Sequence, residues 1–288
     1  MTQTSVREQT LKCLDRLPKL SPLMAQLLAQ LTRRDCEILD LAQTVERDPL
    51  LSGQILRLAN SAVFGRLRPV ASVRHAIAMV GIGAMRKFVL ASSISNLFSR
   101  TKVPANFSVR RFNVHSVATA TLVELLSEEV PFEASEDAFL AGLLHDIGKL
   151  LIAVSLPRQY DEILALLAVT GGTLIEAERD VLGIDHAELS GLAVSRWELS
   201  EEIQWAACYH HEPEKAAAIE RPGPHKAGLS LGVRYADAYI NQLGMSVLPV
   251  SLAPAKTLVL EIPGFAFPQE RLLDRFGHEI QRLSEMFH

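Results

Sequence analysis

The 288-residue sequence lacks the features of several protein classes. Its three cysteines, Cys13, Cys36 and Cys208, lie far apart and form no CxxC motif. This spacing argues against a disulfide framework and a thiolate metal site, and it is typical of a reducing cytoplasm. No apolar run approaches the ~20 residues of a membrane helix, and the opening residues, MTQTSVREQT, are polar rather than signal-like. We therefore expect a cytoplasmic protein without a membrane segment.

Alternating strand patterns are also scarce, because only KTLVLEI, residues 256–262, looks extended. Helical signals dominate instead. Asp48 followed by Pro49 is typical of an N-cap with proline at the first helical position, and Ser72 and Gly81 bound another short helix. Helical spacing further fits residues 83–98, 109–129, 135–152, 157–170, 173–182, 185–197, 200–211, 225–242 and 268–287. The sequence predicts an all-α fold, arranged as a two-lobed helical bundle.

Charge is divided unevenly along the chain. Residues 1–112 hold 17 Lys and Arg against 7 Asp and Glu, whereas the remainder holds 12 against 26. Two lobes with different electrostatic roles, two lobes that attract each other, and ordinary solvated faces all explain this division. Loop-like composition near 100–110 and 244–268 suggests boundaries. We predict an N-terminal helical lobe at 1–107, a second lobe at 108–245 and a C-terminal extension at 246–288 that ends in a helix.

The segment AGLLHDIGKLL, residues 141–151, places His145 and Asp146 among apolar neighbours. A buried carboxylate without a partner costs several kcal/mol, roughly, so something must compensate it. A metal ion, a hydrogen-bonded ion pair and an exposed position are the alternatives. Lys149, one turn later, is one possible partner.

Other polar residues with metal-ligand chemistry occur in apolar helical segments. His210 and His211 end one such segment, and Asp237 lies within LSLGVRYADAYI. Imidazoles and carboxylates on separate helices are what a metal site without thiolates needs. A polar network of histidines satisfied in the core is the alternative.

The pattern of His115, His145-Asp146 and Asp237 resembles the signature of the HD superfamily of metal-dependent phosphohydrolases, and HDIGK is the form found in its HD-GYP and HDOD branches. The resemblance implies an HD-type helical core in the second lobe and one or two divalent ions. Iron or manganese would suit these ligands best, with magnesium, zinc or nickel as further candidates. The implied ligands are His115, His145, Asp146 and Asp237 for one ion and His186, His210 and His211 for a second. Asp146 could bridge the two ions, and Lys149 would face a phosphate. Asp146 and Lys149 would thus be the catalytic residues.

Two departures separate the sequence from the HD-GYP branch. No Gly-Tyr-Pro motif follows the double histidine in HHEPEKAAAIERPGPHK. Arg111 stands one turn before His115, where some HD-GYP proteins have an acidic ligand, and a cation there would oppose an additional metal ion. Degradation of cyclic di-GMP is therefore not expected.

The front half resembles the HDOD family, and the resemblance extends over roughly residues 10–245. The resemblance rests on LPKLSP (17–22), VERDPLLSGQILRLANSAVFG (45–65) and SVRHAIAMVGIGAMRKFVL (72–90). It implies a bacterial signal-transduction module, similar in role to a response regulator, that acts through a sensor kinase, receiver or cyclase-type partner or through a nucleotide. A metal-dependent phosphohydrolase or phosphodiesterase acting on a nucleotide or cyclic nucleotide is the alternative. Whether the protein is an enzyme stays open.

The motif LRLANSAVFG has two interpretations. Asn60 and Gly65 suit a turn that ends one helix and fixes the next. The same stretch could display an interaction surface made of Asn60, Phe64, Arg66 and Arg68. These basic residues have little aromatic interleaving and no DNA-binding motif, so nucleic acid is not an expected partner.

Overall fold

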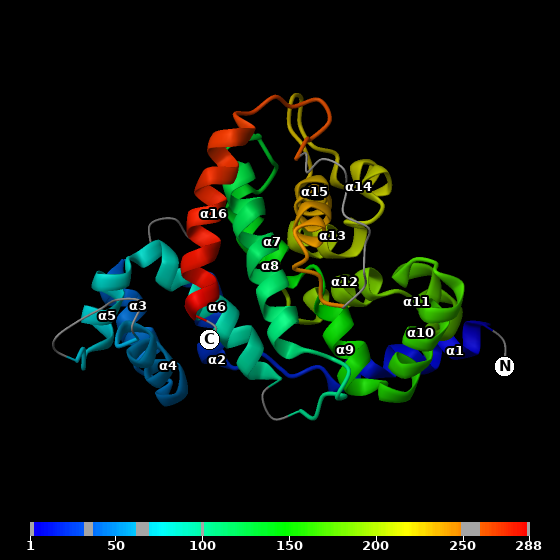
Figure 1. Ribbon diagram of the computed structural model, residues 1–288, viewed down its shortest axis with the longest axis horizontal. Coiled ribbons are helices and arrows are strands. Elements are labelled where there is room, and N and C mark those ends of the chain that lie inside the picture. Colours follow the sequence, from blue (N-terminus) through cyan, green and yellow to red (C-terminus); the bar gives the residue numbers. More distant parts are fainter. Residues whose placement is uncertain (1–2, 32–36, 62–68, 99–100, 249–259, 287–288) are drawn as a thin grey trace. The chain divides into compact units, whose positions relative to one another are not determined.

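The computed structural model of the protein describes residues 3–31, 37–61, 69–98, 101–248 and 260–286 (Figure 1). Contacts group the chain into two compact units. Unit 1 combines residues 1–18 with 101–272, and unit 2 combines residues 19–100 with 273–288. The predicted domains 1–107, 108–245 and 246–288 stay a prediction, because compact groups of contacts do not test which segments fold independently.

The all-α prediction is confirmed. In the described part of the chain there is no strand, and only two isolated bridges occur, between Phe132 and Ala227 and between Ile262 and Phe265. Most of the segment predicted to be extended, 256–259, lies outside the described residues. The predicted last helix, 268–287, is observed as α16 (Gln269–Met286).

Unit 2 contains α2 (Pro22–Leu31), α3 (Ile38–Val45), α4 (Pro49–Ala59), α5 (Val73–Val80), α6 (Ile82–Leu97) and most of α16. Asp48 caps α4, because its Oδ1 accepts hydrogen bonds from the amides of Leu50 (2.9 Å) and Leu51 (3.1 Å). Gly81 has φ of 94°, and the chain bends there by 117° between α5 and α6. A side chain would strain this conformation, which explains the glycine.

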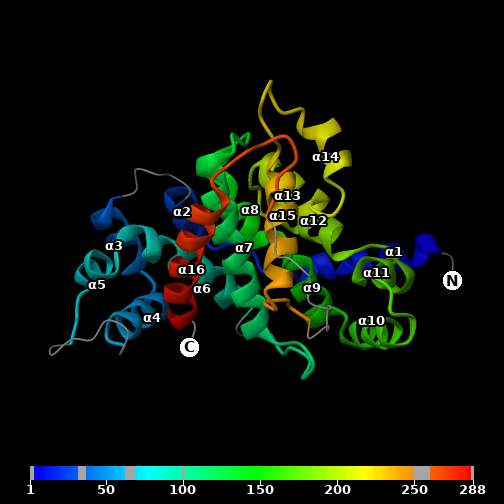
Figure 2. The same ribbon diagram turned by 45° about the horizontal axis from the view of Figure 1, so that its top comes forward.

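Unit 1 holds the remaining helices. These are α1 (Gln3–Leu11), α7 (Val109–Glu129), α8 (Ala138–Leu144), α9 (Ile147–Ser155), α10 (Pro157–Thr170), α11 (Leu174–Leu182), α12 (His186–Arg196), α13 (Glu201–Tyr209), α14 (Pro213–Glu220) and α15 (Leu229–Gln242), with short 3-10 turns η1 (Lys12–Arg16) and η3 (Ser135–Asp137). The long helix α7 packs against both α8 and α15, and α12 packs against α9 and α13 (Figures 1 and 2). Glycine permits one of these close approaches: a Cβ on Gly142 of α8 would lie 2.6 Å from Cα of Ala120 in α7.

The HDIG segment is not the continuous helix that its pattern predicts over 135–152. α8 ends at Leu144 and α9 begins at Ile147, so His145 and Asp146 occupy a break between two helices. At Asp146 the backbone has φ of −106° and ψ of 10°, outside the helical region. The break turns both side chains toward the same point inside unit 1, which a straight helix could not do for adjacent residues.

The stretch Ser135–Ser155 is long and apolar enough by composition to cross a membrane, but 89% of its most apolar window is buried within the protein. That is how the core helix of a folded domain behaves. The paired helices α5 and α6 meet the same criterion only if the 117° bend between them is ignored. The expected cytoplasmic location stays a prediction.

Candidate metal centre

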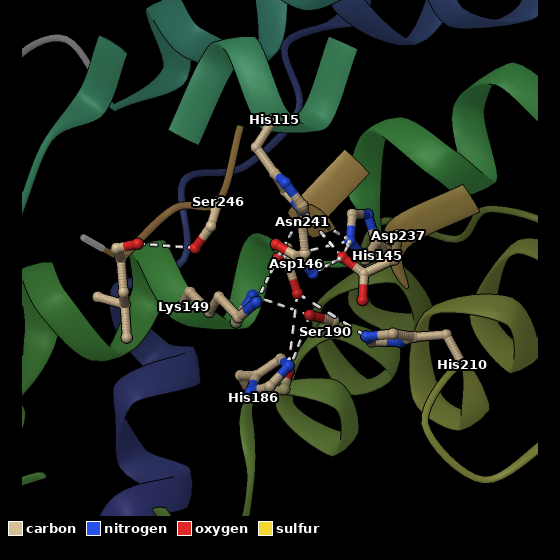
Figure 3. Close-up of polar contacts among 12 residues, drawn as sticks. His115, His145, Asp146, Lys149, His186, Ser190, His210, Asp237, Asn241 and Ser246 are labelled. Atoms are coloured by element: carbon tan, nitrogen blue, oxygen red, sulfur yellow. Dashed lines mark hydrogen bonds and ion pairs between the residues drawn. The ribbon is translucent and has the colours of Figure 1, made fainter. Parts of the chain in front are cut away.

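The structure brings together all seven side chains that the sequence offered as metal ligands. Figure 3 shows His115, His145, Asp146, His186, His210 and Asp237 of this set. Their ligand atoms form two groups, and within each group these atoms lie within 4.8 Å of one another. The first group is His115, His145, Asp146 and Asp237, and the second is His186, His210 and His211. Six of the seven residues are buried, and His211 is half-buried.

Each ligand comes from a different part of unit 1. His115 lies in the middle of α7, and His145 and Asp146 fill the break between α8 and α9. Asp185 caps α12 by accepting a hydrogen bond from the amide of Glu188, which sets His186 at the first position of that helix. The remaining ligands are His210 at the C-cap of α13, His211 in the turn that follows, and Asp237 on α15.

The first group has spacings that suit one ion. Nε2 of His115 lies 3.2 Å from Oδ2 of Asp146 and 3.1 Å from Oδ1 of Asp237. Nε2 of His145 lies 3.4 Å and 3.6 Å from the same two oxygens. An ion with bonds of about 2.1 Å holds adjacent ligand atoms about 3.0 Å apart in an octahedron and about 3.4 Å apart in a tetrahedron. The observed distances of 3.1–3.6 Å lie close to these values.

The second group shares Asp146 with the first. Nε2 of His186 lies 3.0 Å from Nε2 of His211 and 3.4 Å from Oδ1 of Asp146, and Nε2 of His210 lies 3.8 Å from the same oxygen. Oδ1 of Asp146 and Nε2 of His210 are buried and have no hydrogen-bond partner among the described residues. Buried polar atoms without partners are costly, and a cation between them would remove that cost. The two oxygens of Asp146 therefore face two candidate ion positions.

Hydrogen bonds on the outer side of the rings fix the tautomers. The Nδ1 atoms of His115, His145 and His210 lie 3.0, 2.7 and 2.8 Å from the carbonyl oxygens of Met245, Gly142 and Ala207. A carbonyl only accepts, so each Nδ1 carries a proton and Nε2 of each ring faces the centre. Metal-binding histidines are oriented in this way in other proteins.

Glu178 plays the corresponding role for His186 and was missed by the sequence reasoning. Its Oε2 lies 2.6 Å from Nδ1 of His186 and accepts a hydrogen bond of 2.8 Å from the backbone amide of the same residue. The side chain is buried, although it is an acid. A signal was present in the sequence, because Glu178 lies midway between Leu174 and Leu182 on one stripe of an amphipathic helix.

Two further polar residues support the ligands. Asn241, one turn after Asp237, donates from Nδ2 to Oδ1 of that ligand at 2.8 Å. Ser190 accepts a hydrogen bond from the amide of Gly148 at 2.9 Å and donates to the carbonyl of His186 at 2.8 Å. This serine joins the start of α9, next to Asp146, to the first turn of α12, which carries His186. It therefore connects the two groups of ligands.

The electrostatics of the first group favour a proton on His115. Burial lowers the pKa of His115, but Asp146 and Asp237 outweigh it and raise the pKa to about 9. Burial raises the pKa of Asp146, yet the charges of His145 and Lys149 hold it well below its usual range. The pKa of Asp237 is also held low against burial by hydrogen bonds from His115 and His145. In the metal-free protein the acids are ionised, and an ion must displace the proton on His115.

Two rings of the second group, His210 and His211, are neutral near neutral pH. Burial and then the neighbouring His211 and His145 hold the pKa of His210 well below its usual range. Burial and then His186 lower the pKa of His211 to about 3. Neutral imidazoles are the form that binds metal, so these rings can accept an ion near neutral pH without losing a proton.

Lys149 contacts the centre without being a ligand. Its Nζ lies 2.5 Å from Oδ2 of Asp146, and 12% of its side chain is exposed. Burial lowers the pKa of Lys149, but Asp146 and Asp237 outweigh it and raise the pKa, so the side chain is a cation. Together with His186 and His211 it lines a cavity of about 960 Å³. The centre is therefore reachable from one side.

Arg111 does not point its charge at the ligands. Its Nε donates to the carbonyl of Ser246 at 2.9 Å and its Nη2 to the carbonyl of Leu248 at 3.4 Å. His115, one turn later on α7, bonds to Met245 in the same segment. Arg111 thus holds the backbone on which His115 depends, a role that the sequence did not reveal.

The predicted interaction surface is only partly described. Asn60 is exposed, but its side chain donates to the carbonyls of Leu56 and Val70, both at 2.8 Å, and accepts from the amide of Val70 at 2.7 Å. These bonds join the end of α4 to Val70. Phe64, Arg66 and Arg68 lie outside the described residues, so a partner-binding role for this set stays a prediction.

Comparison with known proteins agrees with the helical architecture. An HDOD domain protein of unknown function from Geobacter sulfurreducens is similar with a TM-score of 0.75 and 22% identity, over 98% of this chain and 96% of that one. A proposed phosphohydrolase from Shewanella amazonensis SB2B is similar with a TM-score of 0.72 and 24% identity, over 96% of each chain. At these identities the likeness concerns the fold.

The sequence is also similar to a curated protein and to a family model. An uncharacterised protein of Treponema pallidum (strain Nichols) is 23% identical over an alignment of 223 residues that covers 73% of this chain. The chain spans only 40% of the length of that curated relative. The family model of the HDOD domain matches residues 17–213, well over half of the sequence. The chain therefore belongs to the HDOD family.

Proposed function

We propose that this chain is a bacterial signalling module of the HDOD type that binds one or two divalent transition-metal ions. The observation that carries the proposal is the position of Asp146, whose two buried oxygens face different sets of histidines. Iron and manganese are proposed first, because mixed imidazole and carboxylate ligands suit them, and zinc, nickel and magnesium are further candidates.

In this proposal the bound ions stabilise unit 1, and whether they are bound sets its signalling state. Their ligands come from α7, the α8–α9 break, α12, the end of α13 and α15, so an ion joins helices that are far apart in sequence. Binding to the folded state alone stabilises it by about 3 kcal/mol at a free metal concentration 100 times Kd. Occupancy of the centre can thus change how firmly these helices are held, and through them what the module contacts.

Metal analysis combined with thermal melting tests this proposal. Purified protein should hold one to two transition-metal ions per chain, and EDTA should lower the melting temperature. His145→Gln should also lower it and should reduce the effect of EDTA, because the first group loses a ligand, whereas His75→Gln, at an exposed histidine of α5, should leave both results unchanged. Protein without bound metal whose melt ignores both EDTA and added Mn²⁺ would rule the proposal out.

Signalling requires a partner, and we propose a sensor kinase, receiver or cyclase-type protein, bound through the set Asn60, Phe64, Arg66 and Arg68. Replacing Phe64, Arg66 and Arg68 by alanine should remove crosslinks to the partner while the metal content stays unchanged. Crosslinks of equal yield in this triple variant would place the contact elsewhere.

A metal-dependent phosphohydrolase or phosphodiesterase is the second candidate. The cavity that reaches Lys149, His186 and His211 favours it, because substrate could approach the centre from that side. Bound ions would supply an activated water and bind phosphate oxygens. Asp146 would hold them together, and the cation of Lys149 would orient the phosphate. Turnover on a panel of phosphomonoesters and phosphodiesters that vanishes in His145→Ala with Asp146→Ala would support this function, and turnover retained by the double variant would exclude it.

A further inference from the structure

The cavity beside the metal centre lies within unit 1 and has a volume of about 960 Å³. Ligand sites for small organic molecules commonly have volumes of about 300–1,000 Å³. Asp237, His186 and His211 form part of its wall, so a molecule in the cavity can touch the centre. The charges along the wall indicate which kind of molecule this is.

Three cationic side chains line the cavity, and two of them are already neutralised. Lys149 lies 2.5 Å from Asp146. Nη2 of Arg179 lies 2.7 Å from Oδ2 of Asp185 and 3.3 Å from Oε1 of Glu212. Both cations therefore have carboxylate partners within the protein.

Arg234 differs from these two cations. It lies on α15 one turn before Asp237, and the one hydrogen bond that it donates within the described residues is a long one, 3.4 Å, from Nη1 to the carbonyl of His211. No carboxylate pairs with it in the described part of unit 1. A guanidinium has five N–H donors, so most of its capacity is open to a ligand.

Glu212 and Glu176, two acids on the cavity wall, bond to residues other than Arg234. Glu212 accepts from Arg179 and from Lys215 (2.7 Å), and Glu176 accepts from the amide (2.9 Å) and hydroxyl (2.8 Å) of Thr173. An open arginine beside a metal centre favours an anion with several acceptor oxygens, since the planar fork of the guanidinium matches phosphate.

Another part of the wall is apolar. Leu167 of α10, Leu174 of α11 and the segment with Val247 and Leu248 all line the cavity. A free inorganic anion would leave this surface without contacts, whereas a ligand with an organic group would bury it.

We propose that the cavity binds a phosphate ester with a planar or apolar organic group, of the nucleoside monophosphate class, and that Arg234 binds its phosphate. This inference rests on the proposed function, because the bound ions make the inner wall of the cavity positive. Arg234 is assigned here to recognition of the ligand, whether or not the ligand is then hydrolysed.

Calorimetric titration of the Mn²⁺-loaded full chain tests the assignment, with AMP, GMP and UMP as probes and inorganic phosphate and adenosine for comparison. At least one mononucleotide should bind at least about tenfold more tightly than either phosphate or adenosine. Arg234→Gln should weaken that binding by about tenfold or more, in the range of a lost charge-assisted hydrogen-bonded pair, and Arg234→Lys by less.

Arg158→Gln is the matched control, because Arg158 is an exposed arginine of the same unit that does not line the cavity. It should leave binding unchanged. Metal content is measured on the same samples, so that protein without ions rejects the proposed function and this inference together. Protein with ions that binds none of the mononucleotides, or that binds them equally well with Arg234→Gln, rejects this inference alone.

Discussion

Nδ1 of His186 lies 2.6 Å from Oε2 of Glu178, and both side chains are buried. The contact sets the ring so that Nε2 faces Asp146 and His211. A carboxylate behind a metal-binding histidine also increases the basicity of the ring. Glu178 is therefore a positioning residue for the second group of ligands.

We predict that Glu178→Ala weakens metal binding at the second group by about 10–100-fold and leaves the first group intact, because loss of such a partner has effects of that size. Titration with Mn²⁺ should then show two affinities that are clearly separated. Asp180→Asn, at an exposed acid of the same helix, is the control and should bind like the wild type. Equal loss of both ions would mean that Glu178 supports the fold as a whole.

Lys149 and Asp146, three residues apart, form an ion pair in which the side chain of Asp146 is fully buried. Lys149→Gln should destabilise the metal-free protein by on the order of 3 kcal/mol, because it leaves a buried carboxylate with less compensation. Saturating Mn²⁺ should restore most of the loss, since an ion replaces the missing cation. Urea unfolding with and without Mn²⁺ measures both effects.

Lys215→Gln provides the comparison for that variant. Lys215 and Glu212 have the same spacing in sequence and a distance of 2.7 Å, but 66% of the lysine side chain is exposed. Exposed pairs contribute about 0–1 kcal/mol, so this change should be close to neutral. If both lysine variants lose equal stability, burial of the pair at Asp146 is not the cause.

His115 and His211 give the metal-free protein opposite pH dependences. The pKa of His211 is about 3 in the folded protein, whereas an unfolded histidine has a pKa of about 6.5. The unfolded state therefore binds more protons between these values, so this contribution is present above pH ~6.5 and is lost as the pH falls. For His115, with a pKa of about 9, the contribution is present below pH ~6.5 and is lost as the pH rises through 9.

Urea unfolding of EDTA-treated protein from pH 4 to 10 measures this dependence. One such group changes the free energy of unfolding by at most about 1.4 kcal/mol per pH unit. His211→Gln should flatten the acid side of the profile, and His115→Gln should flatten the alkaline side. His75→Gln, at an exposed position, should change neither side. An acid slope that is as steep in His211→Gln as in the wild type would contradict the assignment.

Arg111 and His115 hold the same segment from one helix. Arg111→Met should loosen residues 245–248 and weaken metal binding at the first group, because the carbonyl of Met245 orients the ring of His115. We expect roughly a tenfold change in the Mn²⁺ dissociation constant, measured by titration. Arg158→Met is the control. Unchanged affinity in Arg111→Met would mean that Met245 keeps its place without the arginine.

Local chemistry predicted much of this fold. The caps at Asp48 and Ser72 and the end of α5 at Gly81 depend on a few neighbouring residues, and all three are observed. Histidines and acids within apolar helical stretches likewise indicated which side chains would gather. These features could be read from the sequence because each is encoded within one or two turns.

Contacts between distant segments could not be predicted in this way. Thr10 donates to the carbonyl of Leu182 at 3.0 Å, and Trp197 donates to the carbonyl of Pro18 at 2.9 Å, so the first residues pack with the HD-type helices. The break at Asp146 is similar. No local sequence pattern predicts this break in the helix. Its cause is the position of the metal ligands on the other helices.

The distance between the two groups of ligands depends on Gly148. A Cβ at this position would collide with the carbonyl of His186, so glycine allows the start of α9 to lie against the start of α12. Gly148→Ala should push the two helices apart, destabilise the protein by about 1–3 kcal/mol and separate Asp146 from His186. Metal binding at the second group should suffer more than at the first. Gly83→Ala, in α6 where a Cβ meets no atom within 4 Å, should be neutral or stabilising by up to about 1 kcal/mol. Two ions bound with unchanged affinity in Gly148→Ala would show that Asp146 does not need this close approach to serve both groups.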